Sequence, residues 1–231
     1  MRLASRRRRA LSAVAGVLSV VAAVGLLSAC TSDPGDRSPG RLVMLSSTVA
    51  DGSARVHGTT TSQVRHFDGI RYAKPPVGAR RWTDPQALTL SGPVDATKPG
   101  AQCAQTAVIP GAQPTTNEDC LFLNITTPRR SVAHAKLPVI VWWHGGGLIS
   151  GAGSQYDATR LAAEGDAVVI TINYRLGLLG YLGLPGLPGS GNFGFADQIA
   201  SLRWVKSHIA AYGGDSGNLT VSGESGGGFN T

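Results

Sequence analysis

The stretch NLTVSGESGGG, residues 218–228, decides the fold of this chain. Its first half predicts a short strand, which runs directly into GESGG at 223–227, a segment of the form G-x-S-x-G. Glycine is required on both sides because Ser225 would occupy a strained strand-to-helix turn, where flanking Cβ atoms would collide. In a chain with 31 glycines the pattern alone is weakly specific. Its position after a predicted strand is the context that a nucleophilic serine requires.

A second glycine-rich segment, HGGG at residues 144–147, also follows a predicted strand. The continuous apolar run from Val139 to Trp143 is typical of a strand buried on both faces of a mostly parallel sheet. Successive glycines let backbone N–H groups converge on one point, where they can stabilise a developing oxyanion. A plain glycine turn with a packed loop histidine, His144, is the alternative interpretation. The order of the two glycine-rich segments favours the catalytic one.

The remaining pattern of strands alternating with helices predicts a parallel α/β sheet. Short β-prone runs from Leu42 to Phe67 indicate small antiparallel strands before it. Residues 68–119 are predicted to be mostly loop. A strand is then predicted at 121–128, a helix at 156–164 and a second buried strand at 167–174.

One longer amphipathic helix is predicted within residues 193–214, ending at Gly213 and Gly214. Its apolar residues recur at spacings of three and four, at Phe195, Ile199, Leu202, Val205 and Ile209.

Six ordered blocks carry a family resemblance. They are FDGIRYAKPPVGARRW (67–82), EDCLFLNITTP (118–128), VWWHGGG (141–147), NYRLGLLGYL (173–182), GNFGFADQIASLRWVKSHIAAYGGD (191–215) and VSGESGG (221–227). From about residue 43 to its end, the chain resembles the N-terminal part of a type-B carboxylesterase, a family that includes cholinesterases and bacterial para-nitrobenzyl esterases. The EDCLFLN block separates this family from the hormone-sensitive-lipase group. The resemblance implies an α/β-hydrolase fold, with a mixed, mostly parallel sheet preceded by small antiparallel strands.

The resemblance also implies roles for single residues in the hydrolysis of a small carboxylic ester. Ser225 would be the acyl nucleophile, and Gly146, Gly147 and Gly226 would donate hydrogen bonds to the oxyanion. Position 226 is usually alanine in the family, and the backbone donor survives the change to glycine. Leu148 stands where the family usually has an aromatic residue, which would alter the acyl pocket. Glu224, which precedes the serine as in the family, would act electrostatically and not as the acid of a triad.

The resemblance further implies a disulfide between Cys103 and Cys120, for which two free thiols are the alternative. Two structural ion pairs are implied in the same way, Arg81 with Glu118 and Arg175 with Asp197. Pairing is physically sensible for the second pair because Arg175 and Asp197 are lone charges within apolar segments. No metal and no organic cofactor is implied.

The charge of the chain is concentrated at its start. The formal net charge is +7, but five of the 21 Lys and Arg residues precede Cys30, whereas all 14 acidic residues follow it. The rest of the chain therefore carries only +2, which leaves no basic stripe to replace the counterions of a nucleic acid. The sequence thus argues against DNA or RNA as a partner.

The first 29 residues predict an export signal. A basic start is followed by twenty uncharged residues, 10–29, which end in the lipobox-like sequence LSAC. We expect Cys30 to be lipidated, with residues 30–42 as a flexible tether and 43–231 as the hydrolase domain, giving an exported lipoprotein anchored to the membrane. An ordinary secretory signal and an uncleaved anchor are the alternatives, and the choice between general and twin-arginine export stays open.

The residues after Ser225 contain no triad partner. In this fold the order is Ser, then Asp or Glu, then His, but only GGGFNT follows the serine. The five histidines, His57, His66, His134, His144 and His208, all precede it, and His208 is expected on the surface of the long helix. We therefore expect a truncated esterase that is inactive alone. A non-catalytic binding or adhesion module on the same fold and the product of a pseudogene are the alternatives.

Overall fold

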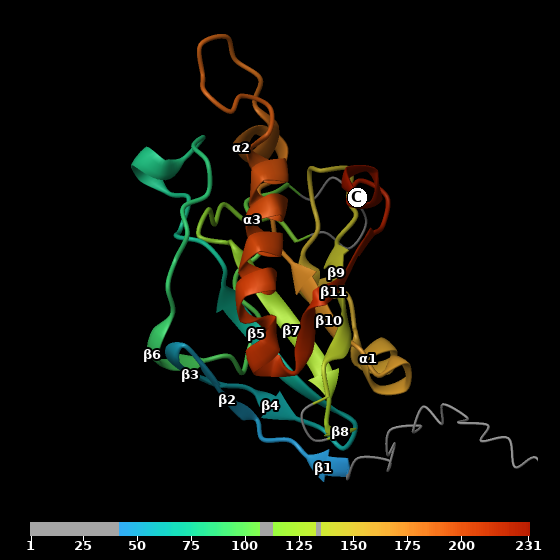
Figure 1. The fold of residues 1–231 in the computed structure, drawn as a ribbon. Helices are drawn as coiled ribbons and strands as arrows, with labels where there is room; N and C mark the ends of the chain where they lie inside the picture. The colour runs from blue at the N-terminus through green and yellow to red at the C-terminus, as the bar shows by residue number, and fades with distance from the viewer. Residues whose placement is uncertain (1–41, 107–112, 133–134) are drawn as a thin grey trace, which may run out of the picture. The chain divides into compact units, whose positions relative to one another are not determined.

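The computed structural model describes residues 42–106, 113–132 and 135–231. The largest sheet has six strands in the spatial order β11-β9-β10-β7-β5-β4 (Figure 1). Along the chain these strands are β4 (Thr59–Thr60), β5 (Val64–Arg71), β7 (Phe122–Pro128), β9 (Leu137–Trp143), β10 (Val168–Ile172) and β11 (Gly214–Gly223). The strands β9, β10 and β11 are mutually parallel, and β7, β5 and β4 continue the sheet in antiparallel fashion. The sheet is thus mixed, as expected, but two of its five described strand pairings are parallel and three are antiparallel, where a mostly parallel sheet was expected.

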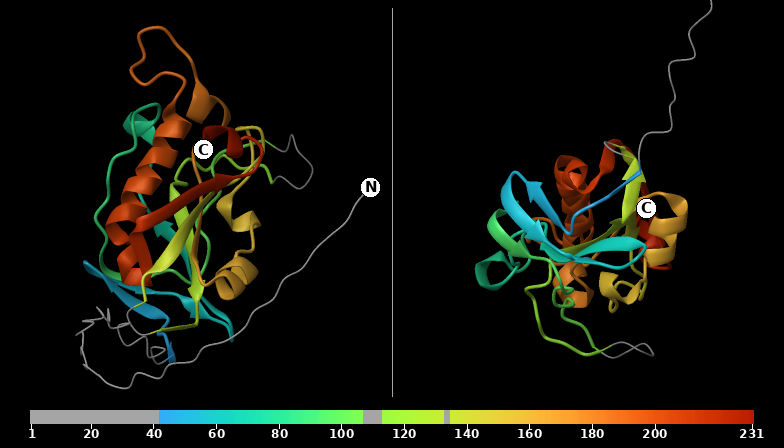
Figure 2. Two further views of the ribbon diagram at one scale, coloured as in Figure 1. Left: turned by 45° about the vertical axis from the view of Figure 1, so that its right-hand side comes forward. Right: turned by 90° about the horizontal axis from the view of Figure 1, so that it is seen from below.

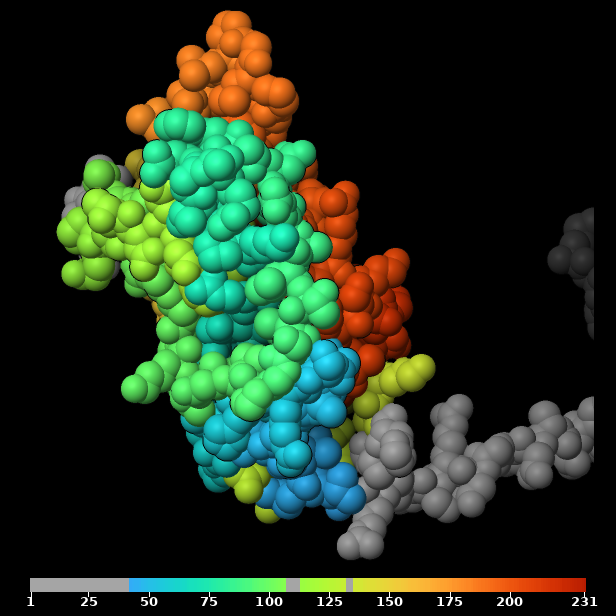
Figure 3. Space-filling model, turned by 90° about the vertical axis from the view of Figure 1, so that its left-hand side faces the viewer, coloured from blue at the N-terminus to red at the C-terminus, as the bar shows by residue number. Residues whose placement is uncertain are grey.

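Two smaller sheets come from the start of the described chain and its neighbours in space. Their strands are β1 (Leu42–Met44) with β8 (Arg130–Val132), and β2 (Thr48–Asp51) with β3 (Ser53–His57) and β6 (Ser91–Asp95). The pairs β1–β8 and β2–β3 are antiparallel, whereas β3 and β6 run parallel. Figure 3 shows the face that these strands and the loops after them cover, with the first strands at its lower end.

Helices cover both faces of the central sheet (Figure 2). They are α1 (Thr159–Gly165), α2 (Gly177–Tyr181) and α3 (Phe193–His208), with short 3₁₀ turns η1 (Gly78–Arg80), η2 (Gly153–Gln155), η3 (Ile209–Tyr212) and η4 (Gly228–Asn230). All five residues of β10 are buried, and because side chains alternate along a strand they serve two cores. Ile170 belongs to the main core with Trp204 of α3, whereas Val169 packs with Ala162 of α1.

The buried face of α3 differs from the predicted one. Phe195 is 40% exposed, and Ile199 and Leu202 are only half-buried. Besides apolar side chains, the buried face carries three polar residues, Asp197, Gln198 and Ser201. The apolar spacing is confirmed at Val205 and Ile209, which are fully buried, and is wrong at Phe195. The helix turns the charged Asp197 inward, because this side chain has a buried partner. The predicted end is confirmed, since Gly213 closes the helical segment with φ 94°.

The interpretation of His208 as a surface residue was also wrong. Its side chain is 25% exposed, and its Nδ1 lies 2.7 Å from a carboxylate oxygen of Asp51. The ring also stacks on Trp204, with the two centroids 4.6 Å apart. This histidine thus joins the long helix to strand β2.

The parallel strands bring the two glycine-rich segments together. In the register of β9 and β11, Gly223 lies opposite Trp143, so the chain leaves both strands at the same edge of the sheet. The segments that follow are 144–147 and 224–227. Ligands of α/β proteins bind at the carboxyl edge of the parallel strands, so we expect the functional site at this edge.

Candidate active site

Ser225 lies on a tight turn directly after β11. Its φ is 48°, a left-handed value that non-glycine residues rarely adopt, and the residue is exposed. The two flanking glycines have no room for a side chain. A Cβ on Gly223 would lie 2.6 Å from the carbonyl carbon of Gly227, and one on Gly227 would lie 2.2 Å from the carbonyl oxygen of Trp143. The requirement for glycine at both positions is therefore steric.

The segment after β9 presents backbone donors beside this turn. Gly146 and Gly147 have φ values of 111° and 61°. A Cβ on Gly226 would lie 3.3 Å from the nitrogen of Gly147, so the two turns are in contact. Within the described residues, no oxygen accepts a hydrogen bond from the N–H groups of Gly146, Gly147 or Gly226. The structure thus brings three free donors together next to an exposed serine, an arrangement that can stabilise a developing negative charge.

His144 holds the glycine segment 144–147 in place through buried contacts. The ring is fully buried and stacks on Tyr174, with the two centroids 4.3 Å apart. Its Nδ1 donates a 2.7 Å hydrogen bond to the carbonyl oxygen of Gly145, and the hydroxyl of Tyr174 donates to the carbonyl of His144 over 2.6 Å. Burial lowers the pKa of His144 to about 4. The histidine is therefore a neutral packing group of the loop.

A hydrogen-bonded chain joins the two turns. The N–H of Gly145 donates to the hydroxyl oxygen of Tyr156 over 2.9 Å, and that hydroxyl donates to Oε2 of Glu224 over 2.6 Å. Burial raises the pKa of Tyr156, and its hydrogen bond to Glu224 raises it further. Glu224 therefore fixes the turn of Ser225 against the glycine loop. Sequence analysis missed Tyr156, because no motif marks a single tyrosine between two turns.

The hydroxyl of Ser225 has no hydrogen-bond partner in the part of the chain that the structure describes. Each of the four described histidines contacts another residue through Nδ1: His57 contacts Thr48, His66 contacts Thr126, His144 contacts Gly145 and His208 contacts Asp51. His134 lies outside the described residues, as do Cys30, the predicted signal and the predicted tether up to residue 41. Leu42, which was predicted to belong to the tether, begins strand β1 instead. None of the described imidazoles is hydrogen-bonded to the Ser225 hydroxyl.

Comparisons with known proteins agree with the arrangement of Ser225 and the glycine segment. A sequence model of the carboxylesterase family matches residues 42–231. The chain belongs to this family. It is similar to a cocaine esterase of Oryctolagus cuniculus, with 44% identity over 181 residues, which are 73% of this chain and 34% of that protein. It is also similar to a para-nitrobenzyl esterase of Bacillus subtilis (strain 168), with 42% identity over 184 residues, which are 76% of this chain and 37% of that protein.

Solved carboxylesterase structures share the fold. A thermophilic PNB esterase superposes with a TM-score of 0.74 at 40% identity, covering 80% of this chain and 40% of that one. A carboxylesterase of Geobacillus stearothermophilus at pH 6.8 gives a TM-score of 0.69 at 40% identity, covering 77% of this chain and 38% of that one. The expected α/β-hydrolase fold is confirmed for the described part of this carboxylesterase chain. The chain spans little more than a third of the length of the curated relatives named above.

A buried ion pair lies close to the candidate site. Nε and Nη2 of Arg175 donate to the two carboxylate oxygens of Asp197 over 2.7 and 2.8 Å, and both side chains are buried. Burial raises the pKa of Asp197, while the hydrogen bond and charge of Arg175 oppose the rise. Two residues beyond Arg175, the N–H of Gly177 donates to the carbonyl oxygen of Leu148 over 2.7 Å. The pair therefore fixes the segment on which the glycine loop rests.

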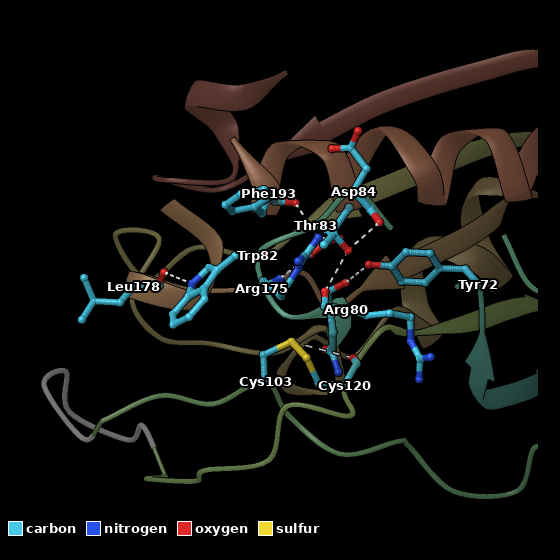
Figure 4. A network of polar contacts seen from close by, with 12 residues as sticks. Tyr72, Arg80, Trp82, Thr83, Asp84, Cys103, Cys120, Arg175, Leu178 and Phe193 are labelled. Atoms are coloured by element: carbon cyan, nitrogen blue, oxygen red, sulfur yellow. Dashed lines mark hydrogen bonds and ion pairs between the residues drawn. A yellow bond between two sulfur atoms is a disulfide. The ribbon is translucent and has the colours of Figure 1, made fainter. Parts of the chain in front are cut away.

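The other implied pairings are present as well. A disulfide joins Cys103 to Cys120, whose Cα atoms are 4.8 Å apart, and the Arg81 guanidinium contacts the Glu118 carboxylate. Figure 4 shows the disulfide below Arg175, and the indole N–H of Trp82 donating to the carbonyl oxygen of Leu178 over 3.0 Å. The hydrogen bond of Trp82 attaches the segment before β7 to helix α2, whereas the disulfide and the ion pair join residues within that segment.

The described residues contain neither a candidate metal site nor a helix that could span a membrane. No group of three His, Cys, Asp or Glu side chains there has the geometry to hold a metal ion. No helix in the same residues is both long enough and apolar enough to cross a membrane.

Proposed function

We propose that the protein is a serine hydrolase of carboxylic esters, with Ser225 as its acyl nucleophile. The observation that carries this proposal is the contact between two turns, one with an exposed serine at φ 48° and the other with unpaired N–H groups. A strained turn that projects a hydroxyl beside free donors has no evident structural purpose. Membership of the carboxylesterase family supports the same chemistry.

The proposed reaction has two halves. The Ser225 oxygen attacks the carbonyl carbon of the ester, and the carbonyl oxygen becomes an oxyanion that accepts hydrogen bonds from the N–H groups of Gly146, Gly147 and Gly226. The intermediate collapses, the C–O bond to the alcohol breaks, and the alcohol leaves with a proton while the acyl group stays on Ser225. Water then attacks the acyl-enzyme, and the carboxylic acid leaves. A general base must take the serine proton, and the contacts of the described residues do not identify it.

An apolar cavity beside the loop supports apolar ester groups as substrates. Its volume is about 560 Å³, and its lining includes Ile149, Leu176, Leu178 and Leu179. Ile149 comes two residues after Gly147, and its side chain is 46% exposed. An exposed aliphatic side chain so close to the donors is suited to an alkyl or acyl chain.

Hydrolysis of p-nitrophenyl butyrate by the purified full-length gene product tests the proposal, because residues 1–231 alone are expected to be inactive. We expect Ser225→Ala to lower kcat by about 10⁵–10⁶-fold, as loss of the nucleophile does in other serine hydrolases. Ser222→Ala, in strand β11 three residues before Ser225, is the matched control and is expected to keep kcat within about threefold. An Ser225→Ala variant that retains the rate would contradict the proposal, and protein that binds esters without turnover would favour a binding module.

We also propose that Cys30 carries a lipid and that the protein is exported and held at the membrane surface. The supporting observation is the sequence LSAC after an uncharged segment. Incorporation of labelled fatty acid in growing cells tests it, with Cys30→Ser as the variant. Label on the wild type and none on Cys30→Ser is expected, and equal labelling of the two would refute lipidation at this cysteine.

A further inference from the structure

The sheet edge opposite Ser225 contains a cavity of about 570 Å³. It lies where β9 and β11 begin, at the lower end of the sheet in Figure 1. Its lining comes from β2, β5, β7, β8, β9, β11 and the 3₁₀ turn η3, and includes Arg65, Thr127, Leu137, Tyr212 and Gly214. The mechanism proposed for Ser225 uses none of these residues.

Arg65 in this cavity is buried without a counter-ion. Its side chain belongs to a residue with 4% exposure, and no described carboxylate lies within 4.0 Å of it. Nη1 donates to the carbonyl oxygen of Ser46 over 3.0 Å and Nη2 to that of Tyr212 over 3.1 Å, while Nε is buried and has no acceptor. Burial lowers the pKa of Arg65 to about 10, so the guanidinium is still charged at neutral pH.

A buried unpaired charge is costly, and the carbonyl contacts of Arg65 do not neutralise it. A guanidinium has five N–H donors in a planar fork, of which two are used here, so donors remain for an oxyanion.

The other charged groups of the cavity leave room for an anion. Lys136, which is exposed, adds a second positive charge. Asp215 is the acidic residue of the lining, and its Oδ1 accepts a 2.8 Å hydrogen bond from the N–H of Gly217 in its own turn. Ser131 contributes a hydroxyl group, which can donate to an acceptor, whereas the Thr127 hydroxyl already donates to the carbonyl oxygen of Tyr212 over 3.4 Å.

We propose that this cavity binds a small oxyanion, a carboxylate or phosphoryl group, with Arg65 as the principal ligand and Lys136 as a weaker second one. The site is separate from Ser225, because it lies at the amino edge of the parallel strands and the serine at their carboxyl edge. Occupancy of the site stabilises the folded protein, since the anion binds only where the fold has assembled the cavity.

Thermal unfolding in different anions at one ionic strength tests the site. Inorganic phosphate and acetate are the two probes, and chloride is the reference. At ten times its dissociation constant, a probe is expected to raise Tm by roughly 3–5 °C above chloride. A rise with phosphate alone assigns the site to phosphoryl groups, and a rise with acetate alone assigns it to carboxylates. Identical Tm values in all three anions would refute the proposal.

Variants locate the effect. Arg65→Met keeps the apolar stem and removes the charge, so the anion-dependent rise in Tm should vanish. Arg55→Met, at an exposed arginine outside the cavity, is the matched control and should keep the full rise. If Arg65→Met does not fold, Lys136→Met gives the answer through a smaller rise, and an unchanged rise in Lys136→Met would count against the site. Ser225→Ala should retain the rise, which separates this proposal from the esterase mechanism.

Discussion

Each end of the central sheet holds a buried arginine, and the two have different partners. At the carboxyl edge, Arg175 is paired through two hydrogen bonds with Asp197, beside the loops that meet at Ser225. At the amino edge, Arg65 has only the carbonyl oxygens of Ser46 and Tyr212. The neutral pair can only hold the structure in place, whereas the unpaired cation leaves a positive charge facing a cavity. The difference indicates a structural role at one end and a binding role at the other.

The largest expected effect on stability breaks this comparison directly. Asp197→Asn leaves the Arg175 charge buried without a partner and should lower the free energy of unfolding by about 3–5 kcal/mol. Arg65→Met should lower it by no more than about 2 kcal/mol, because Ser46 is exposed to water and the carbonyl of Tyr212 keeps a contact with Thr127. Urea unfolding measures both. Equal losses in the two variants would mean that the two arginines have the same role.

A second prediction concerns the donors at the carboxyl edge. A Cβ on Gly146 would lie 2.1 Å from the carbonyl oxygen of Ser150, so Gly146→Ala must displace a donor and should lower kcat by about 10²–10³-fold. Gly226→Ala places its Cβ 3.1 Å from the nearest atom, the nitrogen of Leu148, which a small shift relieves. We expect that variant to keep kcat within about tenfold. A milder effect for Gly146→Ala than for Gly226→Ala would show that the donors are assigned wrongly.

A third prediction is a pH dependence of stability from His144. Burial lowers its pKa to about 4 from 6.5, so the unfolded chain takes up this proton at a higher pH than the folded protein. The free energy of unfolding should therefore fall as the pH drops from about 6.5 to about 4, by up to roughly 3 kcal/mol from this group. His144→Gln should flatten that part of the curve. An unchanged slope in His144→Gln would contradict this prediction.

The smallest expected effect is at a surface pair. Arg160 and Glu164 of α1 form an ion pair with side chains 86% and 65% exposed. Solvent screens such a pair, so Arg160→Ala should change the free energy of unfolding by no more than about 0.5 kcal/mol. If Arg160→Ala lowered the free energy of unfolding as much as Asp197→Asn, burial would not explain the difference in stability between the two ion pairs.

Much of the fold could be predicted because strong local patterns match it. The apolar run of β10 is a strand buried on both faces, whereas in β9, for which burial on both faces was also expected, only every second residue is buried. The glycines at 223 and 227 are sterically required, as expected. These features depend on residues close in sequence, so a short window contains the signal.

The parts that could not be predicted depend on partners distant in the chain. The prediction of the buried face of α3 was wrong in part, because Asp197 turns inward to pair with Arg175, which lies in another segment. The link from Tyr156 to Glu224 joins residues 68 positions apart, and Arg65 looked like an ordinary strand residue. Neither pattern nor spacing shows which polar side chain will be buried with a partner and which without one.

The central claim is that Ser225 is the nucleophile, and the most direct measurement is the site of covalent modification. The full-length gene product is treated with a fluorophosphonate and digested, and the modified residue is located by peptide mass spectrometry. We predict a single adduct on Ser225, with Ser222 in the same peptide unmodified and no adduct in Ser225→Ala. An adduct on another residue, or continued ester hydrolysis with Ser225 unmodified, would contradict the account.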